Sequence, residues 1–205
     1  YAQRRLGETP KPVVQSGKTK RHRIVVVNPG STSTKIALFE NEQCIHNIES
    51  DYALPSVNTV EERQRQADEL TQRVLKILHD SKWKTVDAIA ARGGFLPRPP
   101  EKLSGGAYSI AELADGNVRV NETLVAAMLE YPERRHASNL GIPVAAALAR
   151  ILQAPAYVID PVVVDEFTPE AEISGYKGVT RRSISHALSV RAAARKAAES
   201  LGRNL

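Results

Sequence analysis

The chain has 205 residues, 42% of them hydrophobic, which is enough to bury the core of one domain or of one domain and part of another. No stretch approaches the roughly 20 apolar residues that a membrane-spanning helix needs, and the N-terminal segment lacks the apolar run of a secretory signal. These absences disfavour a membrane or secreted protein, so we expect a cytoplasmic one. The single cysteine, Cys44, excludes an internal disulfide and is expected to be inert packing.

The positive charge is concentrated at the start of the chain. The net charge is +5, but residues 1–23 carry seven Lys or Arg against one Glu, a net of +6, which leaves −1 for residues 24–205. Residues 1–22 have no helical or strand periodicity, which predicts a disordered basic arm. A nucleic-acid-binding face would need cations spread over the folded part.

The first predicted elements form a β-rich unit. The segment RIVVVNPGSTSTKIALFE reads as a strand, a tight loop over Asn28–Ser33 and a second strand, and Gln43–Glu49 reads as a third. Thr59 and Glu62 have the spacing of a capping box, which predicts the start of an amphipathic helix. The strand Val86–Ala91 then leads into a Gly- and Pro-rich loop, ARGGFLPRPPEKLSGG.

Helices and one apolar strand follow. We expect a short strand near Ala107–Ile110, a helix begun by Asn121 and an Ala-rich helix over about Ile142–Leu152. The segment AYVIDPVVVDE is almost continuously apolar and predicts a buried central strand. The last helix, about Arg181–Leu201, should end at Gly202. This order indicates a mixed α/β sheet with helices packed against it.

The turn between the first two strands can bind an anion. Asn28, Gly30, Ser31 and Ser33 crowd it; Gly30 permits positive φ, so several N–H groups could converge there, and Lys35 adds a charge just beyond. A Walker loop would open into a helix, whereas this loop opens into a strand. A plain turn is the competing interpretation.

Two further residues follow predicted strands or lie within them. Arg92 stands at the mouth of the ARGG loop, where a guanidinium can hold a carboxylate or phosphate through two parallel hydrogen bonds. Asp160 lies within the apolar segment YVIDPVVV, and a carboxylate there must be paired, hydrogen-bonded or close to a metal. A surface charge remains the alternative for Arg92.

Two of the five histidines lie beside predicted helices. His136 precedes one in ERRHASNLG, and His186 occupies the first turns of the last helix in RRSISHALS. An imidazole can hydrogen-bond a phosphoryl oxygen, although core or capping roles are the common alternative.

Five blocks of sequence carry a resemblance to a known family. VVNPGSTSTK resembles the opening signature of the acetate and butyrate kinases, of the actin, hexokinase and sugar kinase superfamily; ARGGFLP, RHASNLG, IDPVVVDEF and RRSISHALS resemble later butyrate kinase blocks in the same order. Pro29 and DPVVVDE favour the butyrate and branched-chain acid subfamily. The resemblance implies an α/β fold with an actin-like (ribonuclease H-like) mixed five-stranded sheet and flanking helices. It divides the chain into the arm 1–22, a first domain 23–165 and the start of a truncated second domain, 166–205.

The resemblance also implies a role for each candidate. The phosphate and metal end of the cleft would be lined by Asn28, Gly30, Ser31, Ser33 and Lys35. Arg92 would bind the acid's carboxylate, and Asp160, with Asn28, would help to place Mg²⁺ or the reacting oxygen. His136 and His186 would contact the phosphoryl group in transfer.

The implied reaction is reversible phosphoryl transfer between ATP and a short fatty acid, giving an acyl phosphate and ADP. We expect this chain to be an incomplete, inactive fragment, and the full-length enzyme to be a homo-oligomer, a dimer or higher. Acetate or propionate kinase is the alternative within enzymes, and a non-catalytic ligand- or partner-binding remnant is the alternative outside them. Nucleic-acid binding, which rests on the arm and on the cations of the last helix, is the least favoured reading.

Overall fold

The computed structural model describes residues 20–50, 59–94, 96, 106–130, 136–161, 167–181 and 187–203. Its strands are β1 (Arg23–Pro29), β2 (Thr34–Glu40), β3 (Gln43–Ser50), β4 (Ala88–Arg92), β5 (Ala107–Ala114), β6 (Asn117–Val120) and β7 (Ala156–Ile159). Its helices are α1 (Val60–Asp80), α2 (Glu122–Glu130), the 3₁₀ helix η2 (Ala137–Leu140), α3 (Gly141–Leu152) and α4 (Ala187–Ser200).

All seven strands belong to one sheet, in the order β3-β2-β1-β4-β7-β5-β6. The strands β1, β4 and β7 are parallel to one another, β2 and β3 add an antiparallel meander at one edge, and the β5–β6 hairpin extends the other. The resemblance implied five strands; the strand expected near Ala107–Ile110 is β5, whereas β6, which completes the hairpin, was not expected. The turn of the hairpin, Asp115 and Gly116 with φ of 54° and 76°, is the Asp-Gly pair that favours a two-residue hairpin, a signal that was present in the sequence.

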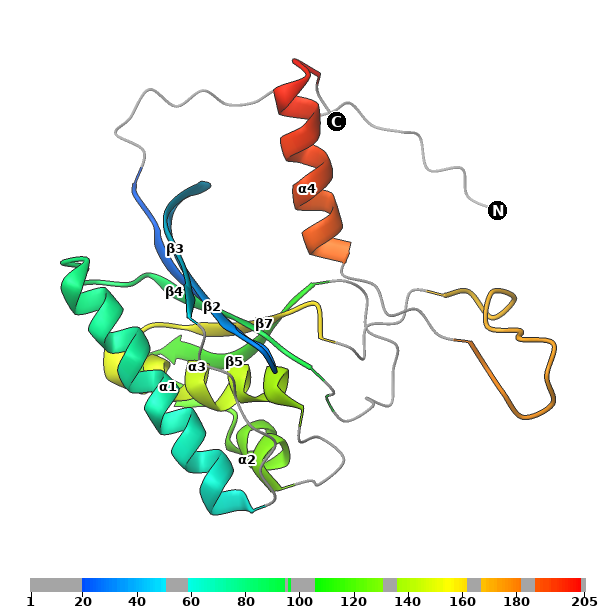
Figure 1. Cartoon of the computed structure of the whole chain (residues 1–205), viewed down its shortest axis with the longest axis horizontal. Coiled ribbons are helices and arrows are strands. Elements are labelled where there is room, and N and C mark those ends of the chain that lie inside the picture. Colours follow the sequence, from blue (N-terminus) through cyan, green and yellow to red (C-terminus); the bar gives the residue numbers. More distant parts are fainter. Residues whose placement is uncertain are drawn as a thin grey trace.

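Helices α1, α2 and α3 pack on one face of the sheet, and the core lies between (Figure 1). The alternation of β1 explains this, because Val25 and Val27 are fully buried while Val26 and Asn28 point to the opposite face. Helix α1 begins as predicted: Thr59 accepts from the Glu62 amide, and the Glu62 carboxylate accepts from the Thr59 amide.

Helix α4 lies on the other side of the sheet (Figure 1), where its residues Leu188, Ser189 and Ala192 line a hollow together with residues of β1 and β4. Residues 182–186 of the expected helix Arg181–Leu201 lie outside the described residues, and Gly202, with φ of 64°, follows the end of α4 as predicted. The side chain of Arg195 reaches Glu42 in the β2–β3 turn at 2.7 Å. Among the described residues, no helix is long and apolar enough to cross a membrane.

The β2–β3 pair contains a bulge. Residues Glu40 and Gln43 face each other across the turn, but the register shifts between Leu38 and Phe39, so that Lys35 lies opposite Glu49. One extra residue in β3 is the ordinary cause of such a shift. Cys44, expected to be buried packing, is instead an exposed free thiol on this edge strand.

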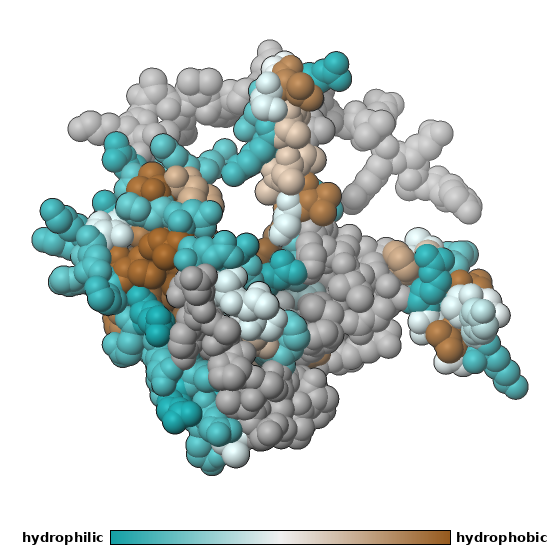
Figure 2. Space-filling model, in the orientation of Figure 1, coloured by the Kyte–Doolittle hydropathy of each residue, from teal (hydrophilic) through white to brown (hydrophobic). Residues whose placement is uncertain are grey.

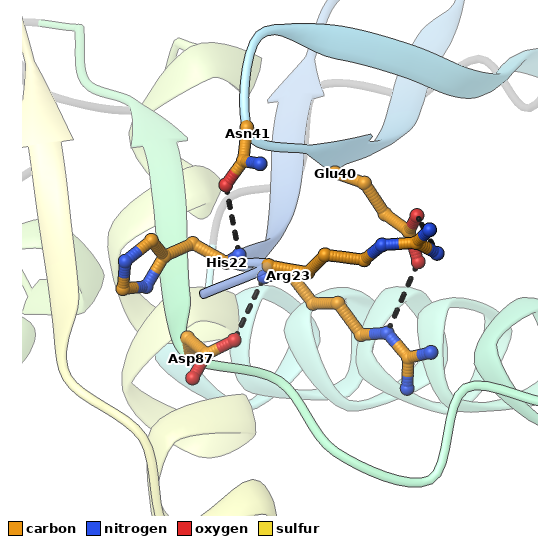
Figure 3. Close-up of polar contacts among 6 residues, drawn as sticks. His22, Arg23, Glu40, Asn41 and Asp87 are labelled. Carbon is orange, nitrogen blue, oxygen red and sulfur yellow. Dashed lines mark hydrogen bonds and ion pairs between the residues drawn. The ribbon is translucent and has the colours of Figure 1, made fainter. Parts of the chain in front are cut away.

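The start of β1 is anchored at the end of the sheet opposite to the β1–β2 loop. Figure 3 shows the Arg23 amide donating to Asp87 at 2.8 Å and the His22 amide donating to Asn41 at 2.9 Å. The guanidinium of Arg23 also pairs with Glu40 and lies over the Trp83 ring. These contacts fix the point where the basic arm joins the fold.

Candidate functional site

A cleft of about 420 Å³ opens at the end of β1 and β4, between the β1–β2 loop and the start of η2. Seven of the nine predicted site residues line it: Asn28, Gly30, Ser31, Ser33, Lys35, Arg92 and His136. Asp160 lies at a second hollow of about 450 Å³, mostly apolar, which shares Asn28 and Arg92 with the cleft. His186 lies outside the described residues.

The β1–β2 loop is shorter and tighter than expected. Asn28 and Pro29 belong to β1, which leaves residues 30–33 as the turn, closed by a hydrogen bond from the Gly30 amide to the Ser33 carbonyl. The φ of Gly30 is not positive, so the loop does not use the conformational freedom that glycine permits there. Glycine is required because a Cβ would lie 2.7 Å from the Ser33 carbonyl oxygen.

Glycines also set the other wall of the cleft. A Cβ on Gly94 would lie 2.1 Å from the side-chain oxygen of Asn139, and one on Gly141 would lie 2.3 Å from the backbone oxygen of Arg92. Real Cβ atoms do not approach other atoms so closely, so the end of β4 lies directly against η2 and the start of α3. This close approach brings Arg92 beside His136 and Ser138.

The ring of His136 caps η2. Its Nδ1 accepts from the Ser138 amide at 3.2 Å and lies 2.7 Å from the Ser138 hydroxyl. Because Nδ1 accepts a backbone N–H, the proton of the neutral ring is assigned to Nε2, which makes that nitrogen a hydrogen-bond donor. A capping histidine and a donor to a phosphoryl oxygen are thus compatible in one residue.

A residue that sequence reasoning missed, Glu49, engages two of the predicted anion ligands. Its carboxylate accepts from the Ser33 hydroxyl at 2.8 Å and pairs with the Lys35 ammonium at 3.5 Å. The hydrogen bond from Ser33 and then the charge of Lys35 lower the pKa of Glu49. The contribution of this cluster to stability is therefore present above the ordinary pKa of 4.5 and is lost as the pH falls through the lower folded value.

Asp160 ends β7 rather than lying within a longer strand. Its backbone has a φ of 43°, its side chain is 1% exposed, and its carboxylate accepts from the amides of Gly106, Leu188 and Ser189. Leu188 and Ser189 belong to the first turn of α4, so Asp160 caps this helix from a distant part of the chain. Residues 162–166, where the predicted strand would continue, lie outside the described residues.

The metal prediction fits the described residues poorly. No group of three or more His, Cys, Asp or Glu side chains converges anywhere in the described ranges, and three backbone donors occupy most of the roughly four acceptor sites of the Asp160 carboxylate. Mg²⁺ prefers several oxygen ligands in octahedral geometry. The pairing of Asn28 and Asp160 as metal ligands stays a prediction.

Comparison with solved structures defines the class of fold. The structure of Porphyromonas gingivalis acetate kinase is similar to this chain, with a TM-score of 0.55 and 15% sequence identity. The similarity covers 89% of this chain and 50% of the acetate kinase chain. At that identity the likeness concerns the fold alone. It confirms the expected α/β class.

Sequence comparison narrows the resemblance. A probable butyrate kinase of Enterococcus faecalis is 37% identical over 180 residues, 88% of this chain and 46% of that protein. One from Coprothermobacter proteolyticus is 38% identical over 181 residues, 85% of this chain and again 46% of that protein. The resemblance to butyrate kinases is thereby confirmed, and the chain spans about half the length of these relatives. No family model matches the chain.

Proposed function

We propose that this chain supplies the acid- and phosphoryl-binding side of a carboxylate kinase of the butyrate kinase type. The observation that carries the proposal is the convergence of Asn28, Lys35, Arg92 and His136 on one cleft together with the glycine-tight β1–β2 loop. The names of the two relatives support the same reaction class. The reaction would move the γ-phosphoryl group of ATP reversibly to a butyrate or branched-chain carboxylate.

Phosphoryl transfer to a carboxylate does not require the protein to form a covalent intermediate. A carboxylate nucleophile is already ionised at neutral pH, since its reference pKa is about 4, and phosphoryl transfer needs alignment and neutralisation of charge. Arg92 can hold the carboxylate or an equatorial phosphoryl oxygen through paired N–H bonds, and the Nε2–H of His136 can donate to another. Mg²⁺ carried on ATP would add charge neutralisation.

Residues 23–165 would then form the acid side of the enzyme, and residues 166–205 would begin the nucleotide side. On this proposal the 205-residue chain binds acyl phosphate weakly and does not turn over. Homo-oligomerisation belongs to the same proposal for the full-length protein.

The first test is isothermal titration calorimetry of the chain with butyryl phosphate, which measures the affinity. We expect Arg92→Gln to lower the affinity at least ten-fold, because a charge-assisted, bidentate hydrogen bond is worth roughly 1.5–3 kcal/mol. Arg150→Gln, which removes an exposed pair with Glu122, is the control and should change nothing. Equal binding by wild type and Arg92→Gln would reject the assignment of the cleft.

The second test is turnover, measured with ATP, Mg²⁺ and butyrate while hydroxylamine traps the acyl phosphate. Absence of product from the 205-residue chain is expected, and turnover near about 10 s⁻¹, an ordinary enzyme rate, would contradict it. Joining the chain to the remaining length of the Enterococcus faecalis relative should restore turnover. Rates with acetate, propionate, butyrate and isobutyrate would then separate butyrate kinase from its closest alternatives.

A non-catalytic ligand-binding remnant is the second candidate. The Glu49 carboxylate favours it, because it occupies the Ser33 hydroxyl and the Lys35 ammonium that an anionic substrate would use. Binding of butyryl phosphate without turnover in the joined chain would support this candidate over the kinase.

A further inference from the structure

The second hollow, of about 450 Å³, lies between helix α4 and the face of the sheet opposite to α1, α2 and α3 (Figure 1). Its sheet wall is formed by Val26, Phe39, Ala90 and Ile159, and Leu188 of α4 faces them. All five residues are partly exposed, so a ligand that enters the hollow can contact their side chains. Neither the resemblance nor the proposed reaction assigns a role to these apolar residues.

A small side chain in the middle of the sheet makes room for this hollow. Ala90 of β4 lies between Val26 of β1 and Tyr157 of β7 in the strand register, and all three side chains point away from the core beneath α1 and α3. The methyl group at position 90 leaves unfilled the space that a larger residue would occupy below α4.

Two contacts hold α4 above this space. At its start, the buried carboxylate of Asp160 accepts from the Leu188 amide at 2.8 Å and from the Ser189 amide at 3.1 Å. Further along, Arg195 pairs with Glu42 at 2.7 Å, but both side chains are exposed and such a pair adds little stability. The Asp160 cap therefore fixes the helix at the end of the hollow that adjoins the cleft.

The hollow and the cleft meet at Asn28 and Arg92, which line both. An acyl phosphate carries its hydrocarbon chain on one side of the carboxyl carbon and its phosphoryl group on the other. When the carboxyl group lies at Arg92 and the phosphoryl group in the polar cleft, the apolar hollow is the space left for the chain. The polarity of the two spaces thus matches the two ends of the substrate.

The size of the hollow exceeds what a butyryl chain needs. A methylene group is about the size of a water molecule, which occupies roughly 30 Å³ in the liquid, so the three carbons beyond the carboxyl group of butyrate fill about 90 Å³. The seven such carbons of octanoate fill about 210 Å³, which is still within the 450 Å³ of the hollow.

We propose that this hollow binds the hydrocarbon chain of the acid and favours medium-chain monocarboxylates, of about six to eight carbons, over butyrate. The inference rests on the proposed function, because that proposal places the carboxylate at Arg92. Contact with Val26, Phe39 and Ile159 removes the chain from water, and each added methylene should raise the affinity about two- to four-fold.

The test titrates the 205-residue chain with acetate, butyrate, hexanoate and octanoate and follows its methyl resonances by NMR. Affinity should rise with chain length by the factor given above, with saturable shifts at Ile159 and Leu188 and none at Ile36, which is buried on the other face. Equal affinities for the four acids, together with binding of butyryl phosphate that depends on Arg92, would overturn this inference and leave the proposed function standing. Failure of every acid and of butyryl phosphate to bind would reject both.

Two variants fill the hollow from opposite walls. Ala90→Leu should remove most of the gain from butyrate to octanoate and leave acetate unaffected. Ala88→Leu is the matched control, because Ala88 lies on the same face of the same strand but does not line the hollow. Ala192→Phe fills the space from exposed α4, so its effect does not require the sheet to accept a larger residue. Chain-length preference that survives both filling variants, or an equal loss in Ala88→Leu, would refute the assignment of the hollow.

Discussion

Glu49 holds two polar side chains of the cleft at once. The Ser33 hydroxyl and the Lys35 ammonium both contact its carboxylate, so an incoming phosphate would meet a negative charge and two ligands that are already engaged. Sequence reasoning identified Ser33 and Lys35 but not Glu49. The reason is geometric: a regular hairpin closed by Glu40 and Gln43 would place Ile48, not Glu49, opposite Lys35.

Replacing Glu49 with Gln should therefore strengthen anion binding. Removing the charge takes away the repulsion and releases Lys35, and we expect inorganic phosphate to bind about two- to five-fold more tightly, the range of exposed ion pairs. Titration followed by ³¹P NMR measures the affinity. Glu42→Gln removes an exposed pair with Arg195 in the β2–β3 turn and serves as the control. Weaker binding by Glu49→Gln would mean that the carboxylate orders the site rather than blocking it.

At the scale of elements, the start of one helix follows from residues close together in the sequence, whereas the start of another depends on a contact with a distant part of the chain. The start of α1 follows from Thr59 and Glu62, three residues apart, and was predictable for that reason. The start of α4 was not, because its cap, Asp160, lies 28 residues before Leu188. The same contact accompanies the end of β7 at Ile159: the next residue, Asp160, adopts a left-handed backbone and turns its carboxylate toward α4.

Asp160→Asn should loosen the first turn of α4 and leave the sheet intact. The amide side chain keeps one acceptor oxygen and loses the charge, so we expect the Leu188 and Ser189 amides to exchange roughly five- to ten-fold faster, from about 1 kcal/mol of lost capping. Hydrogen exchange followed by NMR measures this. Asp87→Asn, which alters a comparable carboxylate-to-amide bond at Arg23, provides the matched control and should leave α4 unaffected. Unchanged exchange at both amides would show that α4 does not depend on Asp160.

At the scale of the whole molecule, most of the predicted site residues lie together at one end of the sheet. Seven predicted site residues converge because the ends of β1 and β4 adjoin η2, which follows from parallel pairing and the glycine contacts. Apolar side chains remain exposed on α4 and on residues 167–181, including Val190, Ile173 and Val179; Figure 2 shows such groups on both segments. The sequence pattern does not predict what covers these side chains, because an apolar face indicates that it is buried but does not identify the surface that packs on it.

Deleting residues 1–22 should leave the fold and phosphate binding unchanged while removing any affinity for DNA. The deletion takes away six of the seven cations of residues 1–23 and retains Arg23, whose amide and guanidinium anchor β1. Fluorescence anisotropy with a short duplex over a range of salt concentrations measures the salt slope, which should fall to near zero. A slope that survives the deletion would locate nucleic-acid contacts on the folded part.

The bulge in β3 determines the polarity of both faces of this edge of the sheet. From the pair Leu38 and His46 to the pair Thr34 and Ser50, the register of β2 and β3 is displaced by one residue relative to the pairs beside the turn. This displacement fixes which residues of β3 face α1 and which face the cleft. In a regular hairpin of the same sequence, Ile48 would lie opposite Lys35, and Glu49 would face the α1 side of the sheet. Deletion of Ile45, the unpaired residue, would remove the bulge and leave every pair from Leu38 and His46 onward unchanged, whereas deletion of Asn47 would turn Ile48 and Glu49 to the opposite faces.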